Sequence, residues 1–413
     1  MKDFLIDPLK NLEQYNKLLS DIKEKVTPIS TYGIIDENLG HFSYCLKEHT
    51  GKQMLLITYD DVRSKNLYED IKNLGCSNVV SFPKREVFYY DVDASSSERT
   101  IKRLDILSRL NNNEDILVVS TLSALLDKIL IPEVFERYTQ VLEIGKEIEL
   151  DKSISTFINA GYERVDMVEG VGQFSLRGGI IDFFPPDSFN PYRIELFDDE
   201  VDSIRSFDMN TQRSIEKVQS VSIPPVKEIL IVDDYKKETI KNLEKDIKKK
   251  YNSKKNAKNL DNDFEKFNKY IELLNENLYM ANRDMIIPYI PEDYLTNILS
   301  YFSDDVTVLI DEPKRLEESF KNFKDDFNMN FTDLLEIGEV LPSHMNLFYD
   351  YKDIIAEIKE KMCITNSALL RGDSNYAPRS IFNFVSKTMP SYHSKLELLK
   401  DDLSHYRYRG YKV

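Results

Sequence analysis

Apolar and polar positions along the first third of the chain predict strands that alternate with helices. Continuous apolar runs at 54–58, 78–82 and 116–120 are typical of strands buried on both faces. Leucines and isoleucines at helical spacing lie between these runs, as in 67–74. Because strands that alternate with helices form parallel sheets, residues 28–125 are predicted to begin an α/β domain.

The first 27 residues predict one amphipathic helix. Its apolar positions, close to helical spacing, are Leu9, Leu12, Leu18, Leu19 and Ile22. Thr27 and Pro28 are expected to end it, because proline disfavours helical backbone in the residue before it.

The pattern changes within 126–225, where short alternating segments and glycine-rich turns replace the long helices. One helix is expected there, at 151–160. This stretch is predicted to be an α+β domain inserted into the α/β domain. The α/β domain resumes over 226–345, which contains an apolar strand at 306–310.

The remaining residues predict a linker or surface excursion at 346–380. Residues 381–413 then look like the start of a further small α/β domain, and the chain stops where a strand is expected to begin. We therefore expect a fragment of a longer protein. A Lys/Asn-rich stretch at 248–262 is either a nucleic-acid tail or a solvated helix face. The second interpretation is favoured, because no aromatic stacking pattern accompanies the charges.

Composition narrows the function. With 55 Lys and Arg against 71 Asp and Glu the net charge is −16, which suits protein partners better than general binding to DNA. Three scattered cysteines and five scattered histidines have no metal-ligand spacing, so no metal is expected. The charged N-terminus is unlike a signal peptide, and no apolar run approaches the ~20 residues that span a bilayer. A cytoplasmic protein that does not bind membranes is expected.

Strand alternation singles out one candidate surface. In 192–197 the side chains of Tyr192, Ile194 and Leu196 share the inner face, whereas Arg193, Glu195 and Phe197 share the outer one. By the same parity Arg177 faces outward, just before the flexible pair Gly178-Gly179. An exposed phenylalanine beside arginines fits a protein-binding hot spot. The alternative, favoured by the residues alone, is a solvated face whose arginines pair with Asp198, Asp199 or Glu200.

The segment 170–214 carries a longer pattern. It contains Gly-x-Phe-x-x-Arg-Gly-Gly, Ile-Asp-x-Phe-Pro, Pro-x-Arg-x-Glu-x-Phe and Phe-Asp-x-x-Thr-Gln-Arg in that order. This pattern resembles the domain shared by the excision-repair protein UvrB and the bacterial transcription-repair coupling factors (the Mfd family). The resemblance extends to Phe82-Pro83 and to the stretch from Phe384 to Val413.

The resemblance implies a RecA/helicase-like parallel-sheet domain, split in sequence by an inserted domain of the UvrB/Mfd domain 2 type. It also implies a partner, UvrA, contacted by Arg177, Arg193 and Phe197. If all three side chains are exposed, their truncation should barely change folding stability. RNA polymerase and DNA are expected to be bound by other domains of the longer protein.

A nucleotide site is implied too, but its chemistry is missing. Where a phosphate loop belongs, the chain runs from Gly33 through acidic residues to Leu39 and Gly40, with no lysine for the phosphates. Asp311 and Glu312, at the end of an apolar strand, are interpreted as relics of a magnesium-organising pair. No catalytic residue set stands out, so this chain is expected to be a non-enzymatic module without cofactors. ATP and magnesium would act in the motor domains of the longer protein.

Two other functions remain open. A UvrB-like ATP-dependent DNA-damage helicase would need the phosphate loop and an aromatic DNA-binding hairpin, for which Phe88, Tyr89 and Tyr90 are too short a remnant. A structural domain that only packs against a motor would lack UvrA binding.

Overall fold

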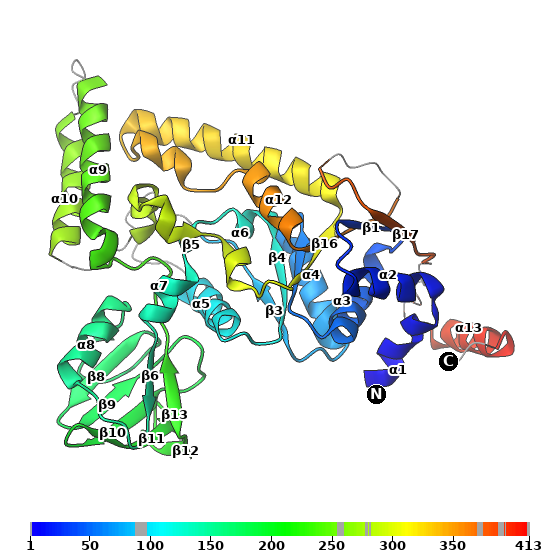
Figure 1. The fold of residues 1–413 in the computed structure, drawn as a ribbon, viewed down its shortest axis with the longest axis horizontal. Coiled ribbons are helices and arrows are strands. Elements are labelled where there is room, and N and C mark those ends of the chain that lie inside the picture. Colours follow the sequence, from blue (N-terminus) through cyan, green and yellow to red (C-terminus); the bar gives the residue numbers. More distant parts are fainter. Residues whose placement is uncertain are drawn as a thin grey trace.

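The computed structural model describes residues 2–86, 97–253, 260–276, 280, 282–369, 375–386, 392 and 394–410. At its centre is a seven-stranded sheet, the main sheet, with the order β17-β1-β16-β15-β2-β4-β3 and parallel pairing between all neighbouring strands (Figure 1). Its strands are β1 (Ile29–Tyr32), β2 (Met54–Thr58), β3 (Val79–Phe82), β4 (Leu117–Thr121), β15 (Thr307–Asp311), β16 (Met362–Ser367) and β17 (Ser380–Asn383). The apolar runs therefore form buried parallel strands, as predicted.

Helices cover both faces of the main sheet. One face buries Leu56, Val119 and Leu309 against α2 (Glu13–Lys23), α3 (Asp36–Thr50) and α4 (Asp61–Asn73). The other face buries Leu55 and Val118 against α5 (Ser97–Asn111), α6 (Leu122–Leu125) and α12 (Tyr351–Glu360). A parallel sheet covered on both faces explains why its strands are apolar throughout.

Residues 1–27, predicted as one helix, form three pieces in the described part. These are α1 (Lys2–Ile6), η1 (Asp7–Asn11) and α2. Pro8 lies in the first turn of η1, and Leu12 has an extended backbone before α2 begins. Leu18 and Ile22 are buried as predicted, whereas Leu12 is exposed.

The inserted domain consists of two sheets and one helix, between β4 and β15 in sequence. Its larger sheet has the order β12-β11-β10-β9-β8-β7, and β6 (Gln140–Glu143) pairs with β13 (Ser220–Ile223) in the smaller one. The strands of the larger sheet are β7 (Glu163–Arg164), β8 (Gln173–Arg177), β9 (Ile180–Phe183), β10 (Tyr192–Phe197), β11 (Glu200–Phe207) and β12 (Ser214–Lys217). The predicted helix at 151–160 is present as α8 (Leu150–Asn159), whose Phe157 packs on Phe174 and Phe183.

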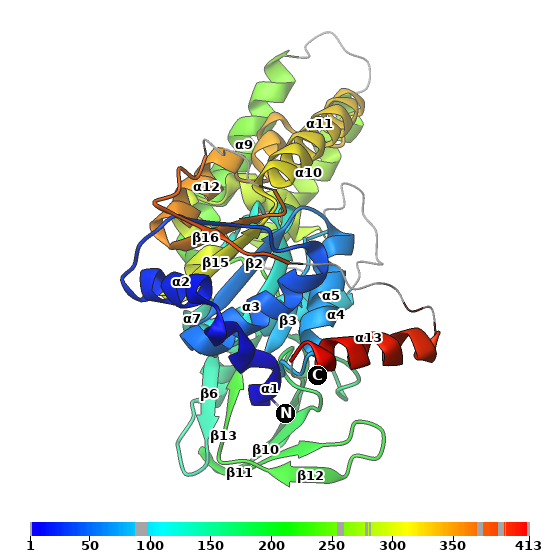
Figure 2. The same cartoon turned by 90° about the vertical axis from the view of Figure 1, so that its right-hand side faces the viewer.

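A third core, the helical lobe, lies at the opposite end of the molecule from the inserted domain (Figures 1 and 2). It is built from α9 (Asp233–Ser253), α10 (Leu260–Asn275), η2 (Arg283–Tyr289), the C-terminal half of α11 (Pro313–Ile337) and η5 (Pro342–Asn346). Lys250, from the Lys/Asn-rich stretch, is buried here and donates to the carbonyl of Val340 at 3.0 Å. Residues 254–259 of that stretch lie outside the described residues.

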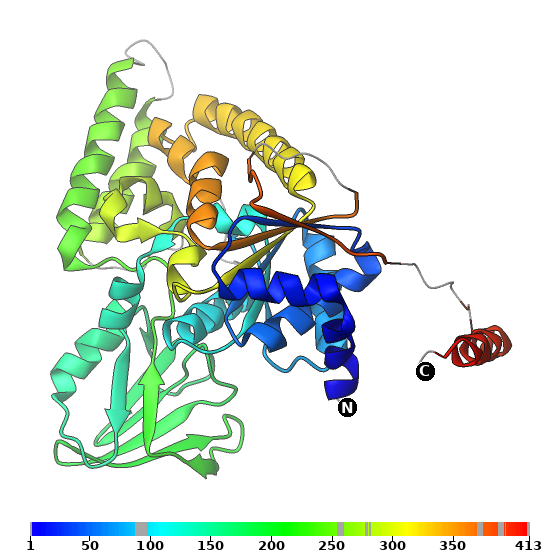
Figure 3. The same cartoon turned by 45° about the vertical axis from the view of Figure 1, so that its right-hand side comes forward.

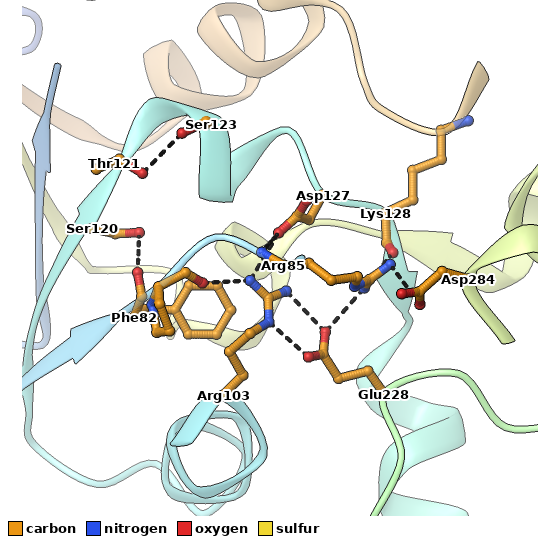
Figure 4. A network of polar contacts seen from close by, with 11 residues as sticks. Phe82, Arg85, Arg103, Ser120, Thr121, Ser123, Asp127, Lys128, Glu228 and Asp284 are labelled. Atoms are coloured by element: carbon orange, nitrogen blue, oxygen red, sulfur yellow. Dashed lines mark hydrogen bonds and ion pairs between the residues drawn. The ribbon is translucent and has the colours of Figure 1, made fainter. Parts of the chain in front are cut away.

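The chain enters the inserted domain once and leaves it once, and these two connections, the crossings, meet in a buried charge network (Figure 4). Arg103 of α5 donates to both carboxylate oxygens of Glu228, at 2.7 and 2.8 Å, and to Asp127 Oδ2 at 2.8 Å. Asp127 precedes the inserted domain and Glu228 follows it. Arg85 also contacts Glu228, at 3.0 Å, so one network joins both crossings to the main sheet.

The predicted fold class is confirmed: a parallel α/β sheet interrupted in sequence by an inserted domain. The tail differs from expectation. Residues 346–380, expected to be a linker, supply α12 and the buried strand β16. Residues 380–383, expected to begin a new domain, pair with β1 at the edge of the main sheet. The following helix, α13 (Leu396–Tyr408), lies apart from the main sheet (Figure 3).

Candidate protein-docking face

The larger sheet of the inserted domain has two faces of different character. Its inner face buries Phe174, Ile181, Phe183 and Ile194 against α8 and the smaller sheet. The predicted alternation of β10 is confirmed, since Ile194 is buried and Phe197 is 79% exposed. The opposite face of this sheet, here called the outer face, carries the predicted docking residues.

Arg177 and Arg193 meet on the outer face around one carboxylate, that of Asp182. Arg193 donates from Nε to Asp182 Oδ1 at 2.7 Å and from Nη2 to Oδ2 at 2.8 Å. Arg177, at the end of the neighbouring strand β8, donates from Nη2 to the same Oδ2 at 2.9 Å. Cross-strand register produces this cluster, because Asp182 lies directly opposite Arg193. The arginines therefore pair within the sheet, and not with Asp198, Asp199 or Glu200.

The two arginines differ in accessibility. The side chain of Arg177 is 52% exposed, whereas that of Arg193 is only 17% exposed. Arg193 also donates to Gln212 Oε1 at 2.9 Å and stacks 4.5 Å above the ring of Phe207. Hydrogen bonding to Asp182 raises the pKa of Arg193 above its ordinary value. The expectation that Arg193 could be truncated without a folding cost is therefore wrong, because its removal would leave Asp182 buried with less compensation.

Phe197 lies at the end of β10, beside the turn to β11, where it pairs with Glu200. On the same face Glu195 accepts from Ser203 at 2.9 Å and pairs with Arg205. The outer face thus offers an exposed aromatic ring and an exposed guanidinium beside the internally paired Glu195 and Arg205.

Three residues that complete this face were missed in the sequence: Asp182, Phe207 and Gln212. Asp182 interrupts the apolar run of β9, and a charge inside such a run is a signal for a buried ion pair. Gln212 has a φ of 59° and lies in a turn. The spacing of apolar residues along the sequence does not predict the path of such a turn.

The region of the missing phosphate loop connects β1 to α3. Gly33 has φ of 82°, and a Cβ there would lie 2.0 Å from the carbonyl oxygen of Phe384. Leu39 and Gly40 lie inside α3, where Leu39 is fully buried and Gly40 packs against Asp70 of α4. The glycines here serve close packing of the chain with itself.

A hollow of about 510 Å³ lies beside this connection. The described residues that line it include no Lys or Arg; they are Leu9, Leu12, Glu13, Gln14, Ile34, Asn38, His41, Phe42, Asn383, Phe384, Val385 and Ser386. Glu13 adds a carboxylate to this lining. This arrangement is unfavourable for phosphate.

Asp311 is the last residue of β15 and Glu312 follows it, as predicted, but the two carboxylates have different partners. Asp311 Oδ2 accepts from Arg63 Nε at 2.8 Å, and Arg63 also pairs with Asp36 at 3.2 Å. Glu312 Oε1 accepts from the backbone N–H of Ala368 at 2.6 Å. Burial raises the pKa of Asp311 to about 6. Within the part of the chain that the structure describes, no group of three or more acidic, His or Cys side chains is placed to hold a metal ion.

Comparison with known proteins agrees with the pattern at 170–214. Residues 141–229 match the UvrB interaction domain family. Over 98% of its length the chain is 29% identical to the transcription-repair-coupling factor of Bacillus subtilis (strain 168), and covers 34% of that protein. The corresponding protein of Staphylococcus haemolyticus is 27% identical over 88% of the chain, which covers 30% of it.

The chain thus spans about a third of the length of these relatives. None of the described helices is both long and apolar enough to cross a membrane. The resemblance found in the sequence is confirmed: the chain carries a UvrB interaction domain, and nearly all of its length is similar to the transcription-repair-coupling factors.

Proposed function

We propose that this chain is a non-catalytic module that recruits UvrA, within a cytoplasmic protein that couples the removal of stalled RNA polymerase to nucleotide excision repair. The observation that carries the proposal is the outer face of the UvrB interaction domain. There Arg177 and Phe197 are exposed on neighbouring parts of one sheet. A rigid sheet that presents a guanidinium and an aromatic ring is a suitable docking surface.

The absence of catalysis is proposed from the connection between β1 and α3. A phosphate loop needs a lysine and open backbone N–H groups. Here Leu39 and Gly40 are packed within α3, and Arg63 already occupies the carboxylate of Asp311. We therefore assign ATP, magnesium, RNA polymerase and DNA to other parts of a longer protein. The UvrB-like helicase would require nucleotide binding by this chain.

UvrA binding tests the proposal, with isothermal titration of purified UvrA as the measurement. Arg177→Ala should weaken binding by about 2–4 kcal/mol if its charge is desolvated against a UvrA carboxylate. Phe197→Ala should weaken binding by about 1–3 kcal/mol through lost apolar contact. Phe197→Ala should unfold at the wild-type temperature, since an exposed side chain contributes little to stability. Arg177→Ala should cost at most about 1 kcal/mol of stability, because Arg193 still donates to both oxygens of Asp182.

Two control variants match these substitutions. Phe189→Ala removes a phenylalanine that is 99% exposed elsewhere in the inserted domain. Arg164→Ala removes an exposed arginine of β7. Arg164 is in register with the inward-facing Phe174, so it does not belong to the outer face. Both controls should bind UvrA as the wild type does. If Arg177→Ala and Phe197→Ala also bind normally, the outer face is not the UvrA-binding surface. If the wild-type chain fails to bind UvrA, the proposed function itself is wrong.

A further inference from the structure

Asp182 is a buried carboxylate on the outer face of the inserted domain. Its side chain is 2% exposed, although its neighbours in register across the sheet are polar. Burying a carboxylate is costly unless hydrogen-bonded cations compensate it. Both oxygens are compensated, through three N–H donations from Arg177 and Arg193. The cluster therefore behaves as one unit: two guanidinium groups held by one anion.

Within this unit the arginines have unequal freedom. Arg193 is fixed by its two bonds to Asp182, by Gln212 and by the ring of Phe207. Arg177 has one bond to Asp182 and remains half exposed. A free arginine loses rotamer freedom when it is immobilised in an interface, whereas one that is already held loses less. Asp182 thus pre-organises Arg177 while leaving other N–H groups of its guanidinium available.

The charges of this cluster also determine which kind of partner surface can bind to the outer face. One carboxylate neutralises one of the two arginines, which leaves the unit with one net positive charge. The neighbouring pair of Arg205 and Glu195 is neutral by itself. Phe197, exposed at the end of β10, provides an apolar contact on the same face. The complementary surface is therefore an acidic side chain next to an apolar pocket.

We propose that Asp182 is a positioning residue that holds Arg177 and Arg193 in the geometry required to bind a carboxylate of UvrA beside an apolar pocket. This inference rests on the proposed function, because it concerns the same partner and the same face. Asp182 itself makes no contact with the partner. Its effect on binding passes through the two arginines.

A double-mutant cycle tests this inference in the full chain. Asp182→Asn keeps the side-chain shape but removes the charge, and should weaken UvrA binding about tenfold. In the Arg177→Ala background the same substitution should cost less, with a difference of about threefold or more between the two backgrounds. A purely structural role would give the same fold-loss in both. Asp202→Asn, which changes an exposed carboxylate of β11 in the same sheet, is the matched control and should bind normally.

A second variant guards against a folding failure of Asp182→Asn. Arg193→Lys retains the positive charge but cannot bridge both oxygens of Asp182. It should fold, weaken binding, and show the same dependence on Arg177. The positioning role is wrong if Asp182→Asn binds UvrA like the wild type. Where Asp182→Asn is unfolded, the same conclusion follows if Arg193→Lys binds like the wild type. The role is also wrong if the loss of binding in either variant is the same with and without Arg177. A wild-type chain that binds no UvrA would instead reject the proposed function.

Discussion

At the scale of single residues, one buried histidine shows how the fold supplies partners for an enclosed polar group. His344, in η5 of the helical lobe, is fully buried. Its Nδ1 accepts from the backbone N–H of Leu341 at 3.0 Å, while Nε2 lies 3.0 Å from the carbonyl oxygen of Met285. These two partners specify a neutral ring protonated at Nε2. Burial lowers the pKa of His344 to about 4.

The low pKa of His344 predicts an acid-labile helical lobe. Between about pH 6.5 and pH 4 the unfolded chain binds a proton that the folded chain does not, so folding stability falls as the pH falls through this window. The loss should reach about 3 kcal/mol near pH 4. Denaturant unfolding at several pH values would measure it. His344→Gln should flatten this part of the profile, whereas His405→Gln, at an exposed position of α13, should leave it unchanged. A profile unaltered by His344→Gln would contradict the prediction.

At the scale of elements, the connection between β1 and α3 is held by contacts within the chain. The positive φ of Gly33 lets the chain pass against the end of β17, and the backbone of Gly33 donates to Ser367 at 3.1 Å. Arg63, from α4, links Asp36 of α3 to Asp311 at the end of β15. These elements are held together by contacts within the chain, without any need for a nucleotide.

We accordingly predict no thermal shift with about 1 mM Mg-ATP. A site with an affinity of about 10 μM would add about 2.7 kcal/mol of stability at that concentration, which differential scanning fluorimetry detects readily. Magnesium with inorganic phosphate serves as the control for ionic effects. A shift of several degrees with Mg-ATP alone would support the UvrB-like helicase instead.

Sequence reasoning succeeded for elements with continuous or alternating apolar patterns, such as β2, β15 and β10. It failed for β16, whose second half is Thr365, Asn366 and Ser367. These polar side chains are tolerated because β1 supplies partners: Thr31 donates to the carbonyl of Thr365 at 3.1 Å and to Asn366 Oδ1 at 3.2 Å. Such partners are over 300 residues away in sequence, so no local pattern reveals them. Asp182 was missed for a different reason: its arginines are only 5 and 11 residues away, but they lie on two other strands, so the pairing depends on the register of the sheet.

At the scale of the whole molecule, Arg103 is a link between three parts of the chain. It joins α5 to Asp127 and Glu228 at the two crossings and stacks 4.2 Å above the ring of Phe82 at the end of β3. Burial alone would raise the pKa of Glu228, but Arg103 and Arg85 outweigh it and lower that pKa to about 2, so this carboxylate stays charged and paired. The inserted domain is thereby anchored at both of its chain connections (Figure 4).

Arg103→Ala should destabilise the protein by about 3–5 kcal/mol, because it leaves buried carboxylates under-compensated. It should also speed proteolysis near the two crossings. Arg99→Ala is the control, since it removes a pair with Glu86 at the surface one turn earlier on α5, worth at most about 1 kcal/mol. Unfolding midpoints and limited proteolysis measure both effects. Equal stability of the two variants would show that the buried network does not anchor the inserted domain.

The strand order of the main sheet has a consequence for synthesis on the ribosome. β1 is made before the other strands of the main sheet, yet its neighbours are β16 and β17, so Ile29 cannot pair until Ile364 and Ser380 have been made. At the usual elongation rate of about 5–20 residues per second, that delay is on the order of 15–70 s. The larger sheet of the inserted domain pairs strands lying entirely within 163–217 and needs no such wait. The docking face is thus complete on the nascent chain while both edges of β1 are still unpaired. The edges of β1 must therefore be protected from pairing with other strands until β17 emerges.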